Sequence, residues 1–206
     1  MPASVKSSPL GLTVLALLHY RPLHPYGIQR LLRQWGKEQV VNVGQRAGLY
    51  RTIERLETGG LIAVRQTERD QQYPERTVYE VTEEGRAATR EWLEQMLAAP
   101  RAEFPAFPAA LSNMLLLTPD EAAPILERRA AQLHARRADL ERQSAEAATG
   151  LPRITLIENE YLIAVLDAEE RWLQGVIGDL RDGSLTWSPE MLAAFQDAAE
   201  SGAAAT

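Results

Sequence analysis

The fold of this chain is decided by residues 49–64, which read LYRTIERLETGGLIAV. Leu49, Ile53 and Leu56 recur at spacings of four and three residues, so they lie on one face of a helix. The two glycines that follow end this helix. After them the periodicity changes, and the residues there and at 77–81 are typical of strands. The stretch therefore predicts a helix that leads directly into a β-hairpin.

Two more helices are predicted before this stretch. Ser8 and Pro9 form an N-cap and first-turn pair, because serine accepts from a backbone N–H and proline has none to lose. Pro25 starts a second helix, which Gly36 ends. The predicted order is helices at 9–19, 25–35 and 45–58, then strands at 61–65 and 77–81 joined by a polar loop at 67–76. This order is typical of a winged helix-turn-helix, whose third helix enters the major groove of DNA.

The outer face of the predicted third helix carries small and cationic side chains. Small or hydrogen-bonding groups near its start approach base edges, Arg51 among them, and cations around them reach phosphates. The hairpin loop adds arginine and glutamine, although its acidic residues dilute the positive charge. We expect DNA contacts from Arg46, Ala47, Tyr50, Arg51 and Arg55 of the helix and from Arg69, Gln71, Gln72 and Arg76 of the loop.

Charge is distributed unevenly along the chain. The net charge is −6, but residues 1–82 hold 11 Lys and Arg against 7 Asp and Glu, whereas residues 83–206 hold 11 against 21. This asymmetry fits a basic module that meets a polyanion and an acidic module with another task. Chance, together with solvated acidic helices, explains the distribution equally well.

The composition argues against several other functions. The chain has no cysteine, so it forms no disulfide and no thiolate metal site. Its three histidines are scattered, and no catalytic constellation or glycine-rich phosphate loop occurs. We therefore expect no enzymatic activity, no cofactor and no metal. No segment reaches the roughly 20 apolar residues of a membrane span, so we expect a soluble, cytoplasmic protein.

The second half of the chain is predicted to be helical. Thr82 caps a helix, residues 100–108 form a proline-rich linker, and a capping box at Thr118 starts a long helix. Three leucines at heptad spacing follow, and a last helix spans about 154–180. The predicted division is a winged-helix DNA-binding domain at 1–82, a connecting helix and linker at 83–100, a helical dimerisation and effector domain at 101–185, and a flexible tail at 186–206.

Four segments in order resemble the PadR family of bacterial transcriptional regulators. They read HPYGI at 24–28, LYRTIERLE at 49–57, GLI at 60–62 and PERTVYEVTEEG at 74–85. The resemblance covers residues 9–97, and 104–180 resembles the helical C-terminal domain of longer members more weakly. It implies a mainly α fold with an N-terminal winged helix and a C-terminal dimerisation domain. It also implies a repressor that a small molecule releases, and it places the family's recognition-helix tyrosine on Tyr50, with its hydroxyl at a phosphate.

A dimer is also expected on physical grounds, because one small winged helix reads only a few base pairs and two copies read an inverted repeat. Aromatic and aliphatic side chains on the helix after Thr82 and on the last helix are the predicted anchors. They are Trp92, Leu93, Met96, Leu166, Trp172, Leu173 and Val176. A place in the intrachain core explains Trp172 equally well and Trp92 less well. Trp92 is also a candidate for lining an effector pocket, although plain packing explains it better.

The sequence therefore predicts a homodimeric, sequence-specific DNA-binding transcriptional regulator. Its expected partners are double-stranded DNA with an inverted-repeat operator, a second copy of itself and a small-molecule effector. The alternative is a winged helix that serves as a protein-interaction module, which the acidic total charge and the diluted loop allow. DNA binding with little salt dependence would favour that alternative.

Overall fold

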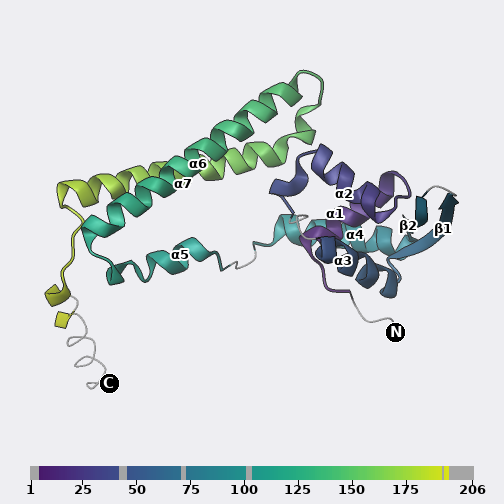
Figure 1. Ribbon diagram of the computed structural model, residues 1–206, viewed down its shortest axis with the longest axis horizontal. Coiled ribbons are helices and arrows are strands. Elements are labelled where there is room, and N and C mark those ends of the chain that lie inside the picture. The colour runs from purple at the N-terminus through teal and green to yellow at the C-terminus, as the bar shows by residue number, and fades with distance from the viewer. Residues whose placement is uncertain (1–4, 42–45, 71–72, 101–103, 192, 195–206) are drawn as a thin grey trace. The chain divides into compact units, whose positions relative to one another are not determined.

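The chain divides into two units, Met1–Ala102 and Glu103–Thr206, in the computed structural model (Figure 1). The structure describes residues 5–41, 46–70, 73–100, 104–191 and 193–194. Helices dominate both units, and the first also holds a two-stranded antiparallel sheet. The predicted mainly α fold with a small β wing is confirmed.

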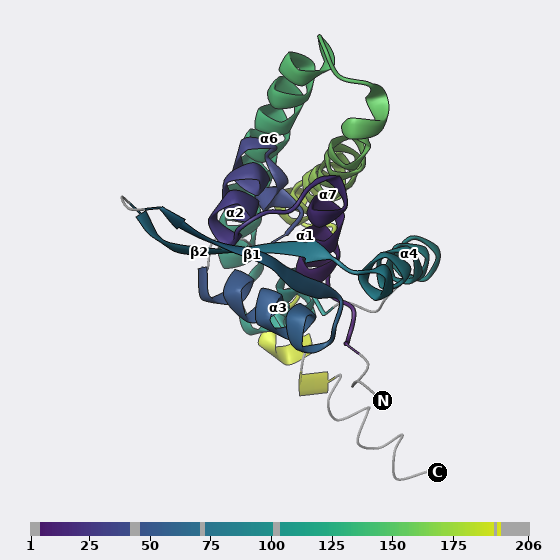
Figure 2. The ribbon, with the colours of Figure 1, turned by 90° about the vertical axis from the view of Figure 1, so that its right-hand side faces the viewer.

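The first unit has the predicted order of three helices and a hairpin. Its elements are α1 (Pro9–Tyr20), α2 (Pro25–Gln34), the 3-10 turn η1 (Lys37–Gln39), α3 (Arg46–Thr58), β1 (Ile62–Asp70), β2 (Tyr73–Val81) and α4 (Glu83–Ala98). In Figure 2 the hairpin crosses in front of the helices, with α2 above it and α3 below it. The three helices and the hairpin thus form a winged helix-turn-helix.

The hairpin is longer than the sequence indicated. Residues 67–70 and 73–76, expected in a loop, belong to the strands, and Thr67 pairs with Thr77. Register shifts lie between Val64 and Gln66 and between Glu68 and Asp70. The prediction was wrong here because backbone hydrogen bonds, which need no apolar side chain, extend an antiparallel ladder beyond its buried residues.

Side-chain caps fix the helix starts of the first unit. Ser8 Oγ accepts from the Gly11 N–H at 3.1 Å, as predicted for α1. His24 Nδ1 accepts from the Gly27 N–H at 2.9 Å and caps α2. The Thr82 hydroxyl caps α4 in the same way and also donates to the Gly60 carbonyl at 2.7 Å. The Thr82 bond joins the end of the hairpin to the turn after α3.

The core of the first unit includes the face predicted from residues 49–64. Leu49, Ile53 and Leu56 are buried against the apolar faces of α1 and α2. Helix α4, expected to be a connector, packs against α1 and contributes Trp92 to the same core. The first unit therefore extends beyond residue 82 and includes α4.

The second unit is built around a helical hairpin. Its elements are α5 (Ala106–Leu111), the 3-10 turn η2 (Met114–Leu116), α6 (Pro119–Ala148), the 3-10 turn η3 (Arg153–Thr155) and α7 (Ile157–Asp182). Helices α6 and α7 lie side by side in Figure 1. The capping box at Thr118 and Glu121 is present. The heptad leucines of α6, Leu126, Leu133 and Leu140, are buried in the core that α6 forms with α7.

The chain beyond α7 also contributes to this core. Trp187 lies in the tail that we expected to be flexible from residue 186, but it is only 9% exposed. Its indole N–H donates to the Leu117 carbonyl at 2.7 Å. The expectation was wrong at this residue, because the indole buries a large apolar area and satisfies its polar atom with the backbone.

Candidate nucleic-acid interface

Helix α3 separates an apolar face from a polar one. Its apolar face is buried in the core, whereas Ala47, Tyr50, Arg51 and Arg55 are exposed. Thr52 lies between the faces, and its hydroxyl donates to the Gly48 carbonyl at 2.9 Å. The exposed face therefore presents small groups near the start of the helix and arginines further along, as a groove-binding helix requires.

The two arginines of this face line the same hollow. The first turn of α1, Val40, Val41 and α3 surround an open depression of about 590 Å³. Arg51 Nε donates to the Ala47 carbonyl at 3.2 Å, and Arg55 Nη2 donates to the Ser8 hydroxyl at 2.8 Å. Sequence reasoning identified Ser8 only as a helix cap. Its contact with α3 joins residues 47 positions apart, and no local pattern signals it.

The wing, which consists of β1 and β2, is fixed to the rest of the first unit through Tyr79 on β2. The backbone of Tyr79 exchanges two hydrogen bonds of 3.0 Å with Leu23, which lies just before α2. Burial raises the pKa of the Tyr79 phenol, and the nearby Glu57 carboxylate, to which the phenol hydrogen-bonds, raises it further. Because Glu57 lies in the last turn of α3, these contacts hold the wing against both helices of the helix-turn-helix. Sequence reasoning missed this pair.

Several predicted DNA contacts fall outside the part of the chain that the structure describes. Gln71 and Gln72 lie outside the described residues. Arg46, Arg69 and Arg76 have a described backbone in α3, β1 and β2, but their side chains lie outside the description. Their contacts with DNA stay predictions.

The predicted interface anchors of α4 occupy different environments. Trp92 is 5% exposed and lies in the core of the first unit, because α4 packs across α1. This placement corrects the expectation that its ring is available to a partner subunit or to an effector pocket. Met96 is partly buried against the same core, and Leu93 is exposed.

The anchors of α7 divide in a similar way. Leu166 and Leu173 are buried against α6. The helical hairpin of α6 and α7 therefore uses the apolar surface that we expected at the dimer interface. Val176 is half-buried, whereas Trp172 is 47% exposed. Trp172 meets the Phe107 ring edge-on, with centroids 6.1 Å apart.

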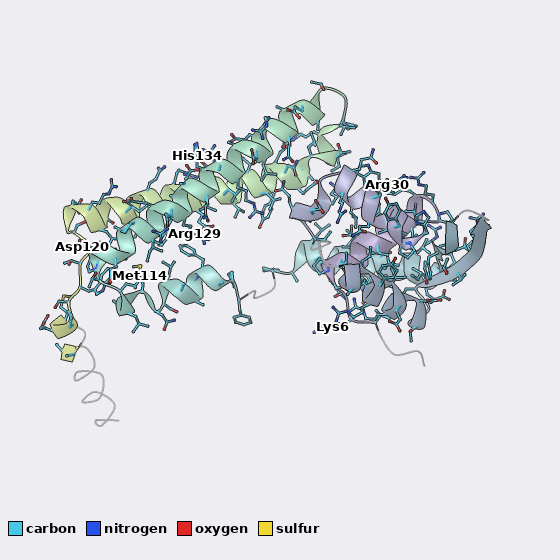
Figure 3. All side chains as sticks on the ribbon, viewed as in Figure 1. Lys6, Arg30, Met114, Asp120, Arg129 and His134 are labelled. Atoms are coloured by element: carbon cyan, nitrogen blue, oxygen red, sulfur yellow. The ribbon has the colours of Figure 1, made fainter. Side chains whose placement is uncertain are left out.

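An arginine completes this aromatic contact on α5. The Arg129 guanidinium lies 3.6 Å above the Phe107 ring centroid, and its Nε donates to Glu169 at 2.6 Å. Figure 3 shows Arg129 on the side of α6 that faces α5. The Phe107 ring and the Arg129–Glu169 ion pair thus connect α5, α6 and α7.

The described residues form neither a metal site nor a membrane-spanning helix. Among the described residues, no three His, Cys, Asp or Glu side chains are grouped so that they could hold a metal ion. None of the helices in the described part of the chain has the length and apolar character needed to cross a membrane.

A helix-turn-helix with a wing beside an exposed, arginine-bearing third helix defines the class of winged-helix DNA-binding regulators. Residues 14–91 match the model of the transcriptional regulator PadR-like family. The family consists of transcriptional regulators, not of enzymes. The suggested resemblance is therefore confirmed. A comparison with the curated proteins found no match.

Solved structures of transcriptional regulators, PadR of Bacillus subtilis among them, share the fold of both units. Bacillus subtilis PadR in complex with operator DNA matches with a TM-score of 0.69 and 16% identity, over 85% of this chain and 99% of that one. The same regulator in complex with p-coumaric acid matches with a TM-score of 0.69 and 15% identity, over 84% and 99%. The Vibrio cholerae virulence activator AphA matches with a TM-score of 0.63 and 19% identity, over 84% and 98%.

Proposed function

We propose that this protein is a homodimeric, sequence-specific DNA-binding transcriptional regulator that acts as a repressor. The observation that carries the proposal is the exposed face of α3, where Arg51 and Arg55 border one hollow beside a buried apolar face. The fold is shared with Bacillus subtilis PadR, which was solved on operator DNA. DNA in the cytoplasm of a bacterial cell is therefore the proposed target.

The proposed dimer places two copies of α3 on an inverted repeat. One winged helix contacts few base pairs, and a two-fold axis doubles the number that is read. Exposed apolar residues of α7 support this role for the second unit, since they repeat at helical spacing on one side of the helix. They are Ile157, Tyr161, Val165 and Trp172. Leu93 and the half-buried Met96 of α4 are proposed to add to the interface.

A small molecule is the proposed signal that releases the DNA. The support is the shared fold with Bacillus subtilis PadR, which was also solved with p-coumaric acid. Trp92 is not part of this proposal, because its ring is buried in the core. A screen of small aromatic acids for loss of DNA binding would identify the effector class.

Fluorescence anisotropy tests the DNA-binding proposal. We would titrate the purified protein onto the DNA upstream of its own coding sequence and onto a scrambled fragment, each at several salt concentrations. We expect preference for the natural fragment, and affinity that falls steeply with salt because lysine and arginine displace counterions from phosphates. Lack of preference for any sequence, including sequences selected from random DNA, together with a flat salt dependence, would contradict it and favour a protein-interaction module.

Light scattering tests the dimer on the same sample. At micromolar concentration we expect twice the chain mass of 22.9 kDa. A monomer mass would contradict the two-fold arrangement without affecting the assignment of α3 to DNA.

A further inference from the structure

The N-terminal strap, residues 5–8, connects the start of α1 to the DNA-facing side of α3. The Ser8 hydroxyl accepts two hydrogen bonds, one from the Gly11 N–H at 3.1 Å and one from Arg55 Nη2 at 2.8 Å. The first bond caps α1, and many helices have such a cap. The second is not needed for capping, and it fixes the end of a long, exposed side chain.

Two close approaches at glycines hold the strap in place. A Cβ on Gly59, just after α3, would lie 2.0 Å from Val5 Cγ2, so Val5 occupies the space that a side chain there would need. A Cβ on Gly11 would lie 2.9 Å from Ser8 Oγ and 3.6 Å from Arg55 Nη2. Val5 also packs against the core of the first unit. The strap therefore contacts the turn after α3 through Val5 and α3 itself through Ser8.

The strap leaves Arg55 able to bind an anion. A guanidinium has five N–H donors, and the described bond to Ser8 uses one of them. Arg55 is exposed and lines the hollow that it shares with Arg51. The planar fork of arginine matches the oxygens of a phosphate, and a side chain that is already ordered loses less entropy when it binds.

We infer that the N-terminal strap presets Arg55 for a phosphate of the DNA backbone, with Ser8 as the positioning residue. The inference rests on the proposed function, since it concerns the same face of α3. The exposed Lys6 lies within the strap (Figure 3), so the strap itself also carries a cation. Residues that precede α1 thus become part of the DNA-binding surface.

A double-mutant cycle on DNA separates this role from helix capping. We would measure the dissociation constants of wild type, Ser8→Ala, Arg55→Ala and the double variant on a DNA site selected from random sequence. Because Ser8 acts through Arg55, we expect Ser8→Ala to weaken binding about fivefold in the wild-type background and not at all in the Arg55→Ala background. The salt slope should fall by about one for Arg55→Ala, as for the loss of one phosphate contact.

The matched control is Thr82→Ala, which removes the hydroxyl cap of α4 from the same unit. We expect it to lower the thermal unfolding temperature, as Ser8→Ala does, while the affinity for DNA stays within about twofold of wild type. Ser8→Thr, which keeps the hydroxyl, should restore the affinity lost in Ser8→Ala. Equal losses of affinity in Ser8→Ala and Thr82→Ala would overturn the inference.

A second variant disturbs the strap without removing either hydrogen-bonding group. Gly59→Ala places a methyl group where Val5 lies, so the strap must shift, and we expect this shift to move Ser8 away from Arg55. We expect it to weaken DNA binding in the wild-type background and to add nothing to Arg55→Ala. If Ser8→Ala or Gly59→Ala weakens DNA binding equally in the wild-type and the Arg55→Ala backgrounds, the inference is overturned while the proposed function stands. A wild-type protein that binds no DNA would instead overturn the proposed function, and the inference with it.

Discussion

Trp92 on α4 is 5% exposed in the core of the first unit, whereas Trp172 on α7 is 47% exposed on the second unit. Both tryptophans lie on helices with nearby leucine or valine, and the sequence placed both at a dimer interface. The sequence favoured a core position less for Trp92 than for Trp172, yet Trp92 is the one that the chain itself buries. The difference shows that burial depends on which element crosses the helix, and α1 crosses α4 at this point.

The largest expected effect follows from this difference between the tryptophans. Trp92→Ala should lower the free energy of unfolding by about 3–5 kcal/mol, because it leaves a large cavity in a packed core. Trp172→Ala should cost about 1 kcal/mol or less within the monomer and should instead weaken the dimer. Urea denaturation and sedimentation of both variants measure the two effects. Equal unfolding costs would show that the tryptophans occupy equivalent environments.

The second expected effect is on DNA binding, which we assign to the first unit. Arg51→Ala should weaken specific binding by about 1–3 kcal/mol and binding to random DNA by less, because we expect its side chain near base edges. The matched control is Arg136→Ala, an exposed arginine on α6 of the second unit, which should change neither affinity. Anisotropy on both DNAs measures this comparison. Equal losses of affinity for specific and random DNA would indicate that Arg51 contacts a phosphate and not a base edge.

Acid should destabilise the second unit through Glu170, which links α7 to α6. The hydrogen bond from Arg137 Nε at 3.0 Å lowers the pKa of Glu170 below its ordinary value of 4.5, and the bond to His134 adds to this effect. A carboxyl with a lowered pKa stabilises the fold above its unfolded pKa, and this stability is lost as the pH falls through the folded pKa. Below pH 4.5 the thermal unfolding temperature of wild type should fall more steeply than that of Glu170→Gln. If the unfolding temperatures of wild type and Glu170→Gln fall in parallel with pH, Glu170 does not cause the acid destabilisation.

The smallest expected effect is an acid response of the first unit through His19, in the joint between α1 and α4. Thr89 Oγ1 donates to the Gly85 carbonyl, so His19 Nε2 donates to Thr89 at 3.1 Å, and Arg86 Nη1 donates to His19 Nδ1 at 3.2 Å. The ring is therefore neutral. Burial, followed by the charges of Arg86 and Arg90, lowers the pKa of His19 below its ordinary value of 6.5.

The sign of this response follows from the lowered pKa. As the pH falls below 6.5, the unfolded chain takes up a proton at His19 before the folded one does, so stability falls. The thermal unfolding temperature of wild type should therefore begin to decrease at a higher pH than the Glu170 effect, and His19→Gln should remove this early decrease. Scanning calorimetry from pH 7.5 to pH 5 measures it, and an unchanged curve in the variant would exclude His19.

Much of the first unit was predictable because its signals are local. Helical spacing of Leu49, Ile53 and Leu56 identified the buried face of α3, and the hydroxyl caps at Ser8 and Thr82 identified helix starts. These features depend on residues a few positions apart. The exposed arginines of α3 follow from the same spacing, since the face opposite a buried one meets solvent.

The second unit shows where such reasoning fails. Periodicity indicated that Leu166 and Leu173 lie on an apolar face, but it did not show what covers that face. The structure shows that α6 covers it, so the two leucines stabilise the hairpin, while Trp172 stays half exposed on another side of α7. Trp187, beyond α7, is buried, and its indole N–H donates to the carbonyl of Leu117, 70 positions away in the sequence.

The sequence by itself determined the long helices, the hydroxyl caps at Ser8, Thr82 and Thr118, the presence of the wing and the arginine-bearing face of α3, because each depends on neighbours along the chain. Only the tertiary structure decided that Trp92 is core, that α6 covers Leu173, and that Ser8 holds Arg55. These three facts depend on contacts between residues far apart in sequence. Such contacts form where packing brings two surfaces together, and the spacing of residues along one element does not specify its partner.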